Sequence, residues 1–513
     1  MQKRFSEKIY LILTPPTEED PKSDREQLLL ALSEYGYSNI QIPLPVLQSL
    51  HATCLENNYQ ITATLVYQED SWTITSVEAG DTRSNHYGLA VDYGSTTIIM
   101  QLVDLNTGAV IGQVREMNGQ VLYGTDILTR ITYTMEHPSH IDDLHRATAD
   151  TFNRLLQRLT LESGISTKDC PVLIISGNTT MIHFLLKLDA RTVFFSPYAP
   201  VTLDPGWFRG PELGFNFSGI VYIIPAASNY IGGDIVSGLL TLDFYRKEEI
   251  GLFFDIGTNG ELVIGNKDWI LAGAGAAGPA LEGYISRYGM HAQDGAIDTV
   301  TIQDELLSFT TIGNQRPMGI CGSGIIDLLA EMRLHGWINI AGKLDPEASS
   351  RIIYFPEEAQ YAVVYATAEE SATGEPLYFS QTDIDQYLDT KAAAYTMIEC
   401  LLDAAGCDKS DIDHCYLSGA FSAHSNLEAA ITIGIFPDLP RNKYTCIPNS
   451  SLDGARTLLL DCSRLDNIRY LLENLCCVQF ASIPDFLIRM QAAKFIPHTN
   501  IEDFPSIEEK LSR

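Results

Sequence analysis

The chain contains one short pattern twice, and this repeat constrains its fold more than any other feature. Residues 88–97 have the sequence GLAVDYGSTT and residues 251–260 have GLFFDIGTNG, so Asp92 and Asp255 each end an apolar run and precede a glycine and a hydroxyl residue. Each copy predicts a buried strand that enters a tight hairpin turn. A single copy fits a structural turn equally well, but two copies favour a duplicated architecture.

Turns of this composition suit phosphate binding. Glycine lets backbone N–H groups approach a polyphosphate closely, and serine or threonine hydroxyls add hydrogen-bond donors. An aspartate at the end of the strand can hold a hydrated Mg²⁺ ion. Two such turns facing each other would therefore clamp the phosphates of a nucleotide.

The chain is long enough for about three folding units, and its composition is that of a globular protein. Its 513 residues exceed the roughly 250 to 300 at which a single core stops growing. No apolar run approaches the roughly 20 residues of a membrane span, and the apolar stretch before Pro15 is too short for the core of a signal peptide. We therefore expect a soluble cytoplasmic protein with no membrane partner.

The charge balance argues against nucleic acid as a partner. The 34 Lys and Arg residues are outnumbered by 65 Asp and Glu residues, which gives a net charge of -31. Affinity for a phosphate backbone comes from clustered Lys and Arg. A nucleotide is still compatible, because backbone amides and a metal ion can hold its phosphates inside a site.

The ten cysteines do not have metal-ligand spacing. No Cys-x-x-Cys occurs, Cys400, Cys407 and Cys415 are seven and eight residues apart, and Cys476 and Cys477 are adjacent without further cysteines nearby. Zinc and iron–sulfur ligation are therefore not expected. The sequence predicts reduced, mostly buried thiols.

Residues 1–86 are expected to form a small α/β domain that a polar stretch at 80–85 ends. Its predicted elements are a strand at 9–13, a helix at 24–35 and strands at 59–67 and 71–77. Beyond residue 86, helices such as the one predicted at 141–161 alternate with short apolar strands, which implies α/β layering.

Three of these later strands run into loops rich in glycine and hydroxyl residues. In α/β sheets, ligands usually bind at the carboxyl ends of strands, where such loops lie. The three are the strand at 172–176 before Gly177–Thr180, the strand at 221–225 before Gly232–Asp234, and the strand at 415–417 before Ser418–Phe421.

Three further motifs each fit both a structural and a functional interpretation. The glycines within 271–283 permit either close approach to a ligand or tight packing of a helix on a sheet. Gly322 and Ser323 precede an apolar helix predicted at 325–332, and they either cap it or contact a nucleotide. Asp234 follows two glycines at a predicted helix start, where it either caps the helix or orients water on a γ-phosphate.

Taken in order, the two hairpins and the later Ser418–Phe421 turn resemble the actin, sugar kinase and Hsp70 ATPase superfamily (ASKHA). In that superfamily the first two loops clamp the phosphates of ATP and the third cradles adenosine. Longer segments are similar to the ATP-dependent reductive activators of corrinoid proteins, and this resemblance covers nearly the whole chain. The segments are KIYLILTPPTEEDPKSD (8–24), YGTDILTRI (123–131), SGNTTMIHFLL (176–186), FDIGTNGELVIG (254–265), AAGPALEG (276–283), GICGSGIIDLLAE (319–331) and LSGAFSAHSNLEAAITIGIFP (417–437).

The resemblance implies an α/β protein with the two-lobed actin-like ATPase fold, a ribonuclease H-like fold in duplicate, preceded by the small domain at 1–86. Residues 87–240 would form the first lobe. Residues 241–513 would form the second lobe, with a C-terminal segment that returns toward the first. ATP and Mg²⁺ are the implied cofactors.

By the same resemblance, Asp92 would position Mg²⁺ through water, and Asp255 would be a second carboxylate near the metal and the attacking water. Asp234 is the third candidate for a catalytic acid. The implied phosphate-binding residues are Gly94, Ser95, Thr96 and Thr97 on one side and Gly257, Thr258 and Asn259 on the other. Adenosine would lie at Gly419, Ala420 and Phe421, and Gly322 and Ser323 are further candidates for contact with the nucleotide.

The chain departs from this family in one respect. Family members carry an iron–sulfur domain, commonly a ferredoxin-like [2Fe-2S] module ahead of the ATPase region, and no cysteine spacing here fits such a cluster. We therefore expect that ATP-driven lobe closure acts on an inactive Co(II) corrinoid protein while a separate ferredoxin donates the electron. A homodimer is compatible with this expectation.

Two other functions remain open. A small-molecule kinase of the same superfamily would form ADP only when its substrate is present. A nucleotide-gated binding protein, the second alternative, would bind ATP and a partner without useful turnover.

Overall fold

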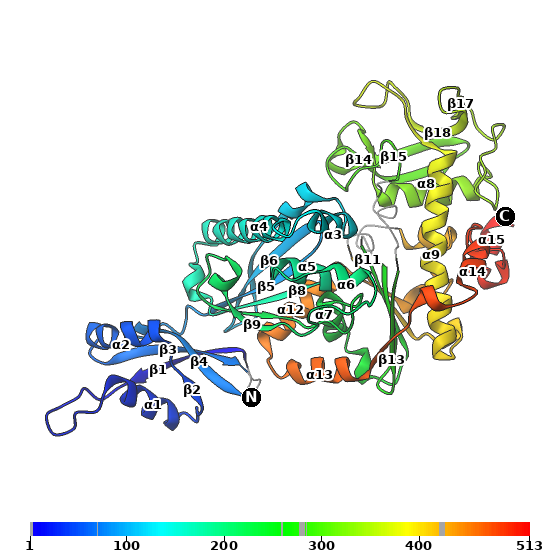
Figure 1. Ribbon diagram of the computed structural model, residues 1–513. Coiled ribbons are helices and arrows are strands. Elements are labelled where there is room, and N and C mark those ends of the chain that lie inside the picture. Colours follow the sequence, from blue (N-terminus) through cyan, green and yellow to red (C-terminus); the bar gives the residue numbers. More distant parts are fainter. Residues whose placement is uncertain are drawn as a thin grey trace. The chain divides into compact units, whose positions relative to one another are not determined.

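The computed structural model describes residues 4–68, 70–257, 260–275, 283, 285–419 and 426–512. Its internal contacts divide the chain into two compact units, and Figure 1 labels the elements of both. Unit 1 comprises Met1–Asp243 and Ser450–Glu473, and unit 2 comprises Phe244–Asn449 and Asn474–Arg513. Four predicted site residues, Thr258, Asn259, Ala420 and Phe421, lie outside the described residues.

Unit 1 begins with a four-stranded sheet in the order β1-β3-β4-β2 that two helices cover on one face. The strands are β1 (Ser6–Ile12), β2 (Ile40–Gln41), β3 (Gln60–Gln68) and β4 (Ser71–Ala79), and the helices are α1 (Asp24–Glu34) and α2 (Leu44–Glu56). A capping box between Ser23 and Glu26 starts α1. Phe5 attaches this sheet to the rest of unit 1, because its buried ring packs 5.4 Å from that of Trp207 and 6.0 Å from that of Tyr222.

The main sheet of unit 1 has the order β7-β6-β5-β8-β10-β9. Its strands are β5 (Tyr87–Tyr93), β6 (Thr97–Asp104), β7 (Val110–Met117), β8 (Val172–Gly177), β9 (Gly206–Arg209) and β10 (Ile220–Ile223). Strands β5, β6 and β7 form an antiparallel meander, whereas β8 pairs in parallel with both β5 and β10. The apolar cluster on one face joins alternate residues of β5 to the helices that follow.

The two faces of this sheet are covered by different helices (Figure 1). Besides α1 and α2, the described α-helices of unit 1 are α3 (Ile127–Glu136), α4 (His140–Ser163), α5 (Thr179–Leu185), α6 (Arg191–Phe194), α7 (Gly233–Leu242), α12 (Ser450–Leu460) and all but the last residue of α13 (Arg464–Asn474). Tyr93 faces α4, where its ring packs 5.7 Å from that of Phe152. Gly88 lies on the opposite face of β5, where Leu459 of α12 packs against it. A Cβ atom at Gly88 would lie 2.9 Å from Leu459 Cδ1. Helix α12 therefore belongs to unit 1, although in the sequence it lies between the two segments of unit 2.

Unit 2 repeats the topology of the main sheet with the order β21-β20-β11-β12-β13-β22. Its strands are β11 (Gly251–Ile256), β12 (Gly260–Gly265), β13 (Ile270–Gly275), β20 (His414–Ser418), β21 (Tyr444–Ile447) and β22 (Leu475–Cys477). Here β11, β12 and β13 form the antiparallel meander, and β20 pairs in parallel with β11 and β21. Each unit thus contains the same arrangement of three antiparallel and two parallel strands.

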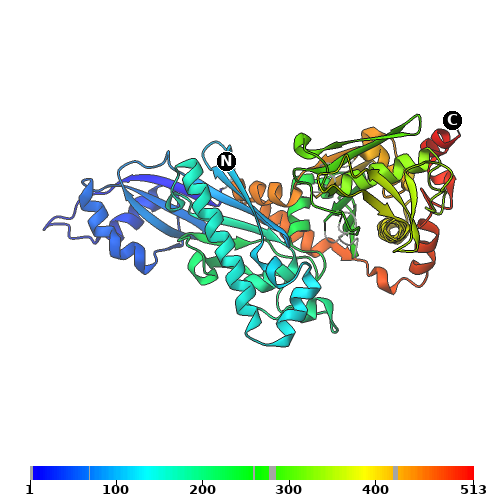
Figure 2. The same ribbon diagram turned by 90° about the horizontal axis from the view of Figure 1, so that it is seen from above.

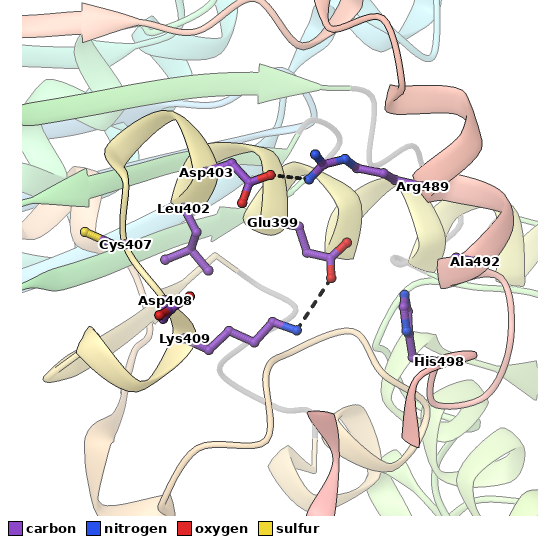
Figure 3. A pocket seen from close by; sticks show the side chains of 9 residues that line it. All are labelled: Glu399, Leu402, Asp403, Cys407, Asp408, Lys409, Arg489, Ala492 and His498. Carbon is purple, nitrogen blue, oxygen red and sulfur yellow. Dashed lines mark hydrogen bonds and ion pairs between the residues drawn. The ribbon is translucent and has the colours of Figure 1, made fainter. Parts of the chain in front are cut away.

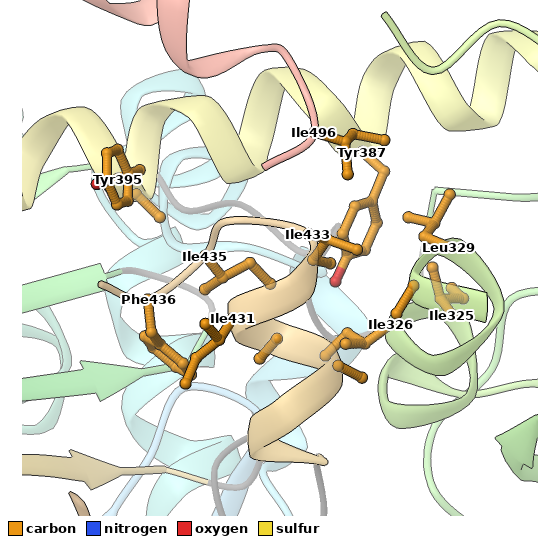
Figure 4. Packing of buried hydrophobic residues seen from close by; sticks show 14 of the residues in the cluster. Ile325, Ile326, Leu329, Tyr387, Tyr395, Ile431, Ile433, Ile435, Phe436 and Ile496 are labelled. Carbon is orange, nitrogen blue, oxygen red and sulfur yellow. The ribbon is translucent and has the colours of Figure 1, made fainter. Parts of the chain in front are cut away.

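In the described part of unit 2, two three-stranded sheets and five α-helices accompany the main sheet. They are β14 (Ala296–Gln303), β15 (Leu306–Thr311), β16 (Gly319–Ile320), β17 (Ile352–Phe355), β18 (Gln360–Ala366), β19 (Leu377–Ser380), α8 (Gly322–Leu334), α9 (Gln381–Ala405), α11 (Leu427–Thr432), α14 (Phe486–Ala493) and α15 (Pro505–Leu511). Figure 2 shows α9 nearly along its axis, in yellow. Figure 4 shows Tyr387 of α9 with Ile433, just after α11, and Ile326 of α8 in one buried cluster.

Most of the predicted elements occur with shifted ends. The helix predicted at 24–35 ends at Glu34, the one predicted at 141–161 covers His140–Ser163, and the one predicted at 325–332 begins three residues earlier, at Gly322. No described helix is long and apolar enough to cross a membrane.

Candidate functional site

Asp92 is the penultimate residue of strand β5 and lies beside the end of β8. In the parallel pairing of these strands Asp92 lies opposite Ser176, and Tyr93 lies opposite Gly177. Gly177 permits this close pairing, because a side-chain carbon there would lie 2.9 Å from the Tyr93 carbonyl oxygen. The predicted metal-binding carboxylate therefore stands at the carboxyl edge of the unit 1 sheet, where α/β folds bind ligands.

The first predicted phosphate turn, Gly94–Thr97, is held by Asn118. The Asn118 side-chain amide donates to the Gly94 carbonyl at 3.0 Å, and its backbone N–H donates to the Thr96 carbonyl at 2.8 Å. Gly94 has no space for a side chain, since a Cβ atom would lie 2.5 Å from the Thr97 carbonyl oxygen. The turn is therefore tight and anchored, and its residues are half-buried.

Asp234 reaches the same edge from the first turn of α7. Two glycines make this possible: a Cβ atom at Gly232 would lie 2.5 Å from the Asn178 Cα, and one at Gly233 would lie 2.4 Å from the Ile224 carbonyl oxygen. The start of α7 consequently packs directly on the ends of β8 and β10. The N-cap residue of α7 is Gly232, which has no side chain to cap with. Asp234 Oδ1 instead accepts a hydrogen bond from the first-turn N–H of Ile235 at 2.9 Å, which fits the structural alternative, and the role in orienting water stays a prediction.

The two carboxylates of unit 1 interact electrostatically. Burial is the main cause that raises the pKa of Asp234, to about 7. The hydrogen bond from the Ile235 N–H lowers this pKa, and the charge of Asp92 raises it by a smaller amount. Neighbouring carboxylates repel each other unless one is protonated or a cation lies between them. Hard oxygen donors of this kind suit Mg²⁺, so the residues fit the metal that the sequence predicted.

Ser451, the second residue of α12, completes the surroundings of Asp92. Its hydroxyl donates to Asp92 Oδ1 at 2.8 Å and lies 2.9 Å from the Ser176 hydroxyl. Neither Ser451 nor Asn118 was predicted as a site residue. Ser451 comes from a helix 359 residues away in the chain, and Asn118 follows β7 in a segment whose sequence carries no ligand-binding pattern.

Unit 2 places Asp255 in the equivalent position. Asp255 is the penultimate residue of β11 and lies opposite Ser418 of the parallel strand β20. Gly419 follows with a φ of +93°, and a Cβ atom there would lie 2.2 Å from the Ile256 carbonyl oxygen and 2.9 Å from Asp255 Oδ1. Only glycine fits this left-handed, crowded position. Two predicted site residues, Asp255 and Gly419, are therefore brought together.

Gly257 differs from these glycines. No described atom lies within 4 Å of the position that its Cβ would take, so nothing in the described packing requires a glycine there. Its neighbours Thr258 and Asn259 lie outside the described residues, and the phosphate-binding role of all three stays a prediction.

Ser323 and Gly322 have clear structural contacts. The Ser323 hydroxyl donates to the Asp298 carbonyl at 2.9 Å, while Asp327 and Glu331, one and two turns later, accept from the backbone N–H groups of Val300 and Ile302. Side chains on one face of α8 thus form hydrogen bonds with the backbone N–H and C=O groups of β14. Gly322 is the first residue of that helix. These contacts support the structural interpretation of the motif, and nucleotide contact stays a prediction.

A pocket of about 270 Å³ opens elsewhere in unit 2, and none of the predicted site residues lines it (Figure 3). Lys409 pairs with Glu399 and Asp503, and Arg489 pairs with Asp403 and Asp485. The cations at this pocket are therefore already neutralised by carboxylates.

All ten cysteines are free thiols, and Cys446, Cys476 and Cys477 are exposed. Among the residues that the structure describes, no group of three or more His, Cys, Asp or Glu side chains is placed to hold a metal ion.

Three family models match consecutive parts of the chain. Residues 5–84 match the RACo linker region, residues 87–247 match the RACo middle region, and residues 249–508 match the C-terminal domain of RACo, the ASKHA domain.

Two characterised relatives and one solved structure are similar over most of the chain. The corrinoid activation enzyme RamQ of Eubacterium limosum is 30% identical over 382 residues, which cover 73% of this chain and 64% of the relative. The [Co(II) methylated amine-specific corrinoid protein] reductase of Methanosarcina barkeri is 25% identical over 415 residues, 74% of this chain and 71% of the relative. The structure of a reductive activator for a corrinoid, iron–sulfur protein is 34% identical, covers 99% of this chain and 81% of that chain, and superposes with a TM-score of 0.89.

These matches confirm the predicted fold class, an α/β protein with the actin-like ASKHA fold preceded by further domains. The chain spans 64% of the length of the Eubacterium limosum relative.

Proposed function

The chain belongs to the RACo family of corrinoid activators, and from this premise we propose that it is an ATP-dependent activator of a corrinoid protein. The proposed activity is the coupling of ATP binding and hydrolysis to the reduction of an inactive Co(II) corrinoid to Co(I). The observation that carries the proposal is the Asp92 site of unit 1. There two carboxylates, a glycine turn and serine hydroxyls meet at the carboxyl edge of the sheet.

The proposal assigns Mg²⁺·ATP to the two hairpins. Asp92 would hold the hydrated metal ion, with Asp234 beside it, and the Gly94–Thr97 turn would bind phosphate through its backbone N–H groups and hydroxyls. Asp255 and Gly257 would engage the nucleotide from unit 2, with adenosine near Gly419. The bound metal would neutralise charge on the phosphates. It would also offset the repulsion between Asp92 and Asp234, which adds to the larger effect of burial on the pKa of Asp234.

ATP binding would drive a change in conformation that promotes electron transfer. Moving a two-state equilibrium from 1:99 to 99:1 takes about 5.5 kcal/mol of differential binding. A γ-phosphate and its metal ion held by two hairpins offer contacts of that order. ATP is hydrolysed to ADP and phosphate in this cycle and contributes no electron.

The electron therefore needs its own donor, which we propose to be a low-potential ferredoxin. One electron passes from the reduced ferredoxin to Co(II), which yields oxidised ferredoxin and Co(I). The corrinoid protein and the ferredoxin are the two proposed protein partners.

Anaerobic stopped-flow absorbance of the corrinoid tests the proposal. Co(I) formation should require this protein, ATP with Mg²⁺, the corrinoid protein and reduced ferredoxin together. Asp92→Asn should slow the reduction, and Ser463→Ala, which changes an exposed side chain of unit 1, should not. Equal rates with and without this protein would overturn the activator role. They would favour a nucleotide-gated binding protein if ATP still binds, or a kinase if a small molecule stimulates ADP formation.

A further inference from the structure

We propose that Ser451 is a positioning residue for Asp92, a role that rests on the proposed function and names a residue outside the two hairpins. Ser451 is the second residue of helix α12, which lies between the two segments of unit 2 in the sequence but packs in unit 1. Its hydroxyl is within hydrogen-bond distance of the one carboxylate that the proposed function assigns to the metal ion. It would act on the metal site only through Asp92.

The Ser451 hydroxyl has one proton to donate, and the neighbouring groups determine which acceptor receives it. Ser451 Oγ lies 2.8 Å from Asp92 Oδ1 and 2.9 Å from Ser176 Oγ. The Ser176 hydroxyl has an acceptor of its own, the Gly233 carbonyl at 3.1 Å. Ser451 can therefore donate to Asp92, and a hydrogen bond to a charged carboxylate is about twice as strong as one between neutral groups.

The backbone of Ser451 is fixed from the opposite side by α7. The Ser237 hydroxyl donates to the Ser451 carbonyl at 2.7 Å, and a Cβ atom at Gly454 would lie only 1.9 Å from the Ser237 carbonyl oxygen. The two helices thus touch backbone to backbone. Because α7 also carries Asp234, the hydroxyl of Ser451 and the second carboxylate are held by the same helix pair.

Burial keeps water away from the hydrogen bonds of these serine hydroxyls. Ser451 is 6% exposed, and both Ser176 and Ser237 are fully buried, so water does not compete freely for these hydroxyls. A hydrogen bond at Oδ1 restricts rotation of the carboxylate plane of Asp92. Loss of this bond should weaken metal binding without removing the metal ligand itself.

Four proteins distinguish positioning from a purely structural role: the wild type, Ser451→Ala, Ser451→Thr and Ser237→Ala. The Ser237 variant removes a hydrogen bond between the same two helices but none to Asp92, so it is the matched control for stability. Electron paramagnetic resonance of Mn²⁺, titrated in the presence of ADP, gives the metal dissociation constant of each. Thermal unfolding without nucleotide gives its stability.

We expect Ser451→Ala to raise the Mn²⁺ dissociation constant by about 5- to 20-fold, the range for loss of one charge-assisted hydrogen bond that acts indirectly. Ser451→Thr keeps the hydroxyl and should stay within about twofold of the wild type. Ser237→Ala should lower Tm but leave the Mn²⁺ constant unchanged. The Mg²⁺ concentration for half-maximal ATP hydrolysis should follow the same order.

Two results would overturn the inference, and they differ from each other. If the wild type binds Mn²⁺ with ADP and Ser451→Ala binds it equally well while losing stability as Ser237→Ala does, Ser451 is only structural. If the wild type itself binds no Mn²⁺ with ADP, the proposed nucleotide function fails, and the positioning role fails with it. If Ser451→Ala does not fold, Ser451→Cys keeps the size and a weaker donor and should give an intermediate constant.

Discussion

The two hairpin sites of this protein share one topology and differ in what surrounds the aspartate. In both units the aspartate is the penultimate residue of the first strand of an antiparallel meander. It lies opposite a serine of the adjacent parallel strand, Ser176 for Asp92 and Ser418 for Asp255. A glycine follows each serine and passes close to a carbonyl oxygen, that of Tyr93 in unit 1 and that of Ile256 in unit 2.

The difference lies in the later elements. In unit 1 two helices, α7 and α12, bring Asp234 and Ser451 to Asp92. In unit 2 a second carboxylate, Glu261 of the antiparallel strand β12, lies opposite Asp255, and a Cβ atom at Gly419 would lie 2.9 Å from Asp255 Oδ1. Duplication therefore specifies where an aspartate stands, whereas among the described residues the second carboxylate comes from a helix in unit 1 and from the adjacent strand in unit 2.

The largest expected difference between the two sites is the loss of folding stability when the glycine after each serine is replaced. Gly419→Ala should cost about 3 kcal/mol of folding stability, because it combines a positive φ with a backbone contact at 2.2 Å. Gly177→Ala should cost less, since its contact is 2.9 Å and needs no left-handed backbone. Denaturant unfolding measures both. Gly257→Ala is the control and should be close to neutral, and an equal loss in all three would contradict the steric difference.

The next largest expected difference is in how much Mg²⁺-nucleotide stabilises variants of the two aspartates. A ligand at roughly 100 times its Kd stabilises the folded state by about 2.7 kcal/mol. We expect Asp92→Asn to lose most of the Mg²⁺-dependent part of this stabilisation in a thermal shift assay, because Asp92 is the proposed metal ligand. Asp255→Asn should retain more of it. The reverse order would move the metal site to unit 2.

The effect of Asp234 on folding stability should depend on pH, and this dependence tests the electrostatics of the Asp92 site. Burial and the charge of Asp92 raise the pKa of Asp234 above its unfolded value, so ionisation of Asp234 costs folding stability. That cost is absent below the unfolded pKa and complete above the folded pKa. Without nucleotide or metal, Asp234→Asn should therefore raise Tm by a few degrees, and more at about pH 8 than at about pH 5. A gain that shrinks as pH rises would contradict the repulsion.

The smallest expected effect concerns Ser323 of unit 2. Its hydroxyl donates to the Asp298 carbonyl, so Ser323→Ala should cost about 1 kcal/mol of stability, the usual value of one buried hydrogen bond. ATP affinity by calorimetry should not change if the contact is purely structural. A clear loss of affinity would instead support the nucleotide contact that the sequence motif suggested.

Part of the fold was predictable because its patterns are local. The repeated Asp-x-Gly pattern at Asp92 and Asp255 predicted a duplicated strand and hairpin, and the comparisons confirm both the fold class and the family. The predicted boundaries at residues 86 and 240 stay predictions, as do the roles of individual site residues. The long helix α9 was not predicted, because its sequence has no clear apolar stripe and it is packed on several sides.

The sequence by itself determined the two aspartates, their turns and the glycines after Ser176 and Ser418, since strand patterns and steric demands on glycine act over a few residues. Only the tertiary structure decided what meets Asp92. Ser451 is 359 residues from Asp92 in the chain, and it reaches the carboxylate because Gly454 lets α12 lie against α7. A hydrogen bond between such distant residues depends on the packing of whole helices, and no local pattern encodes it.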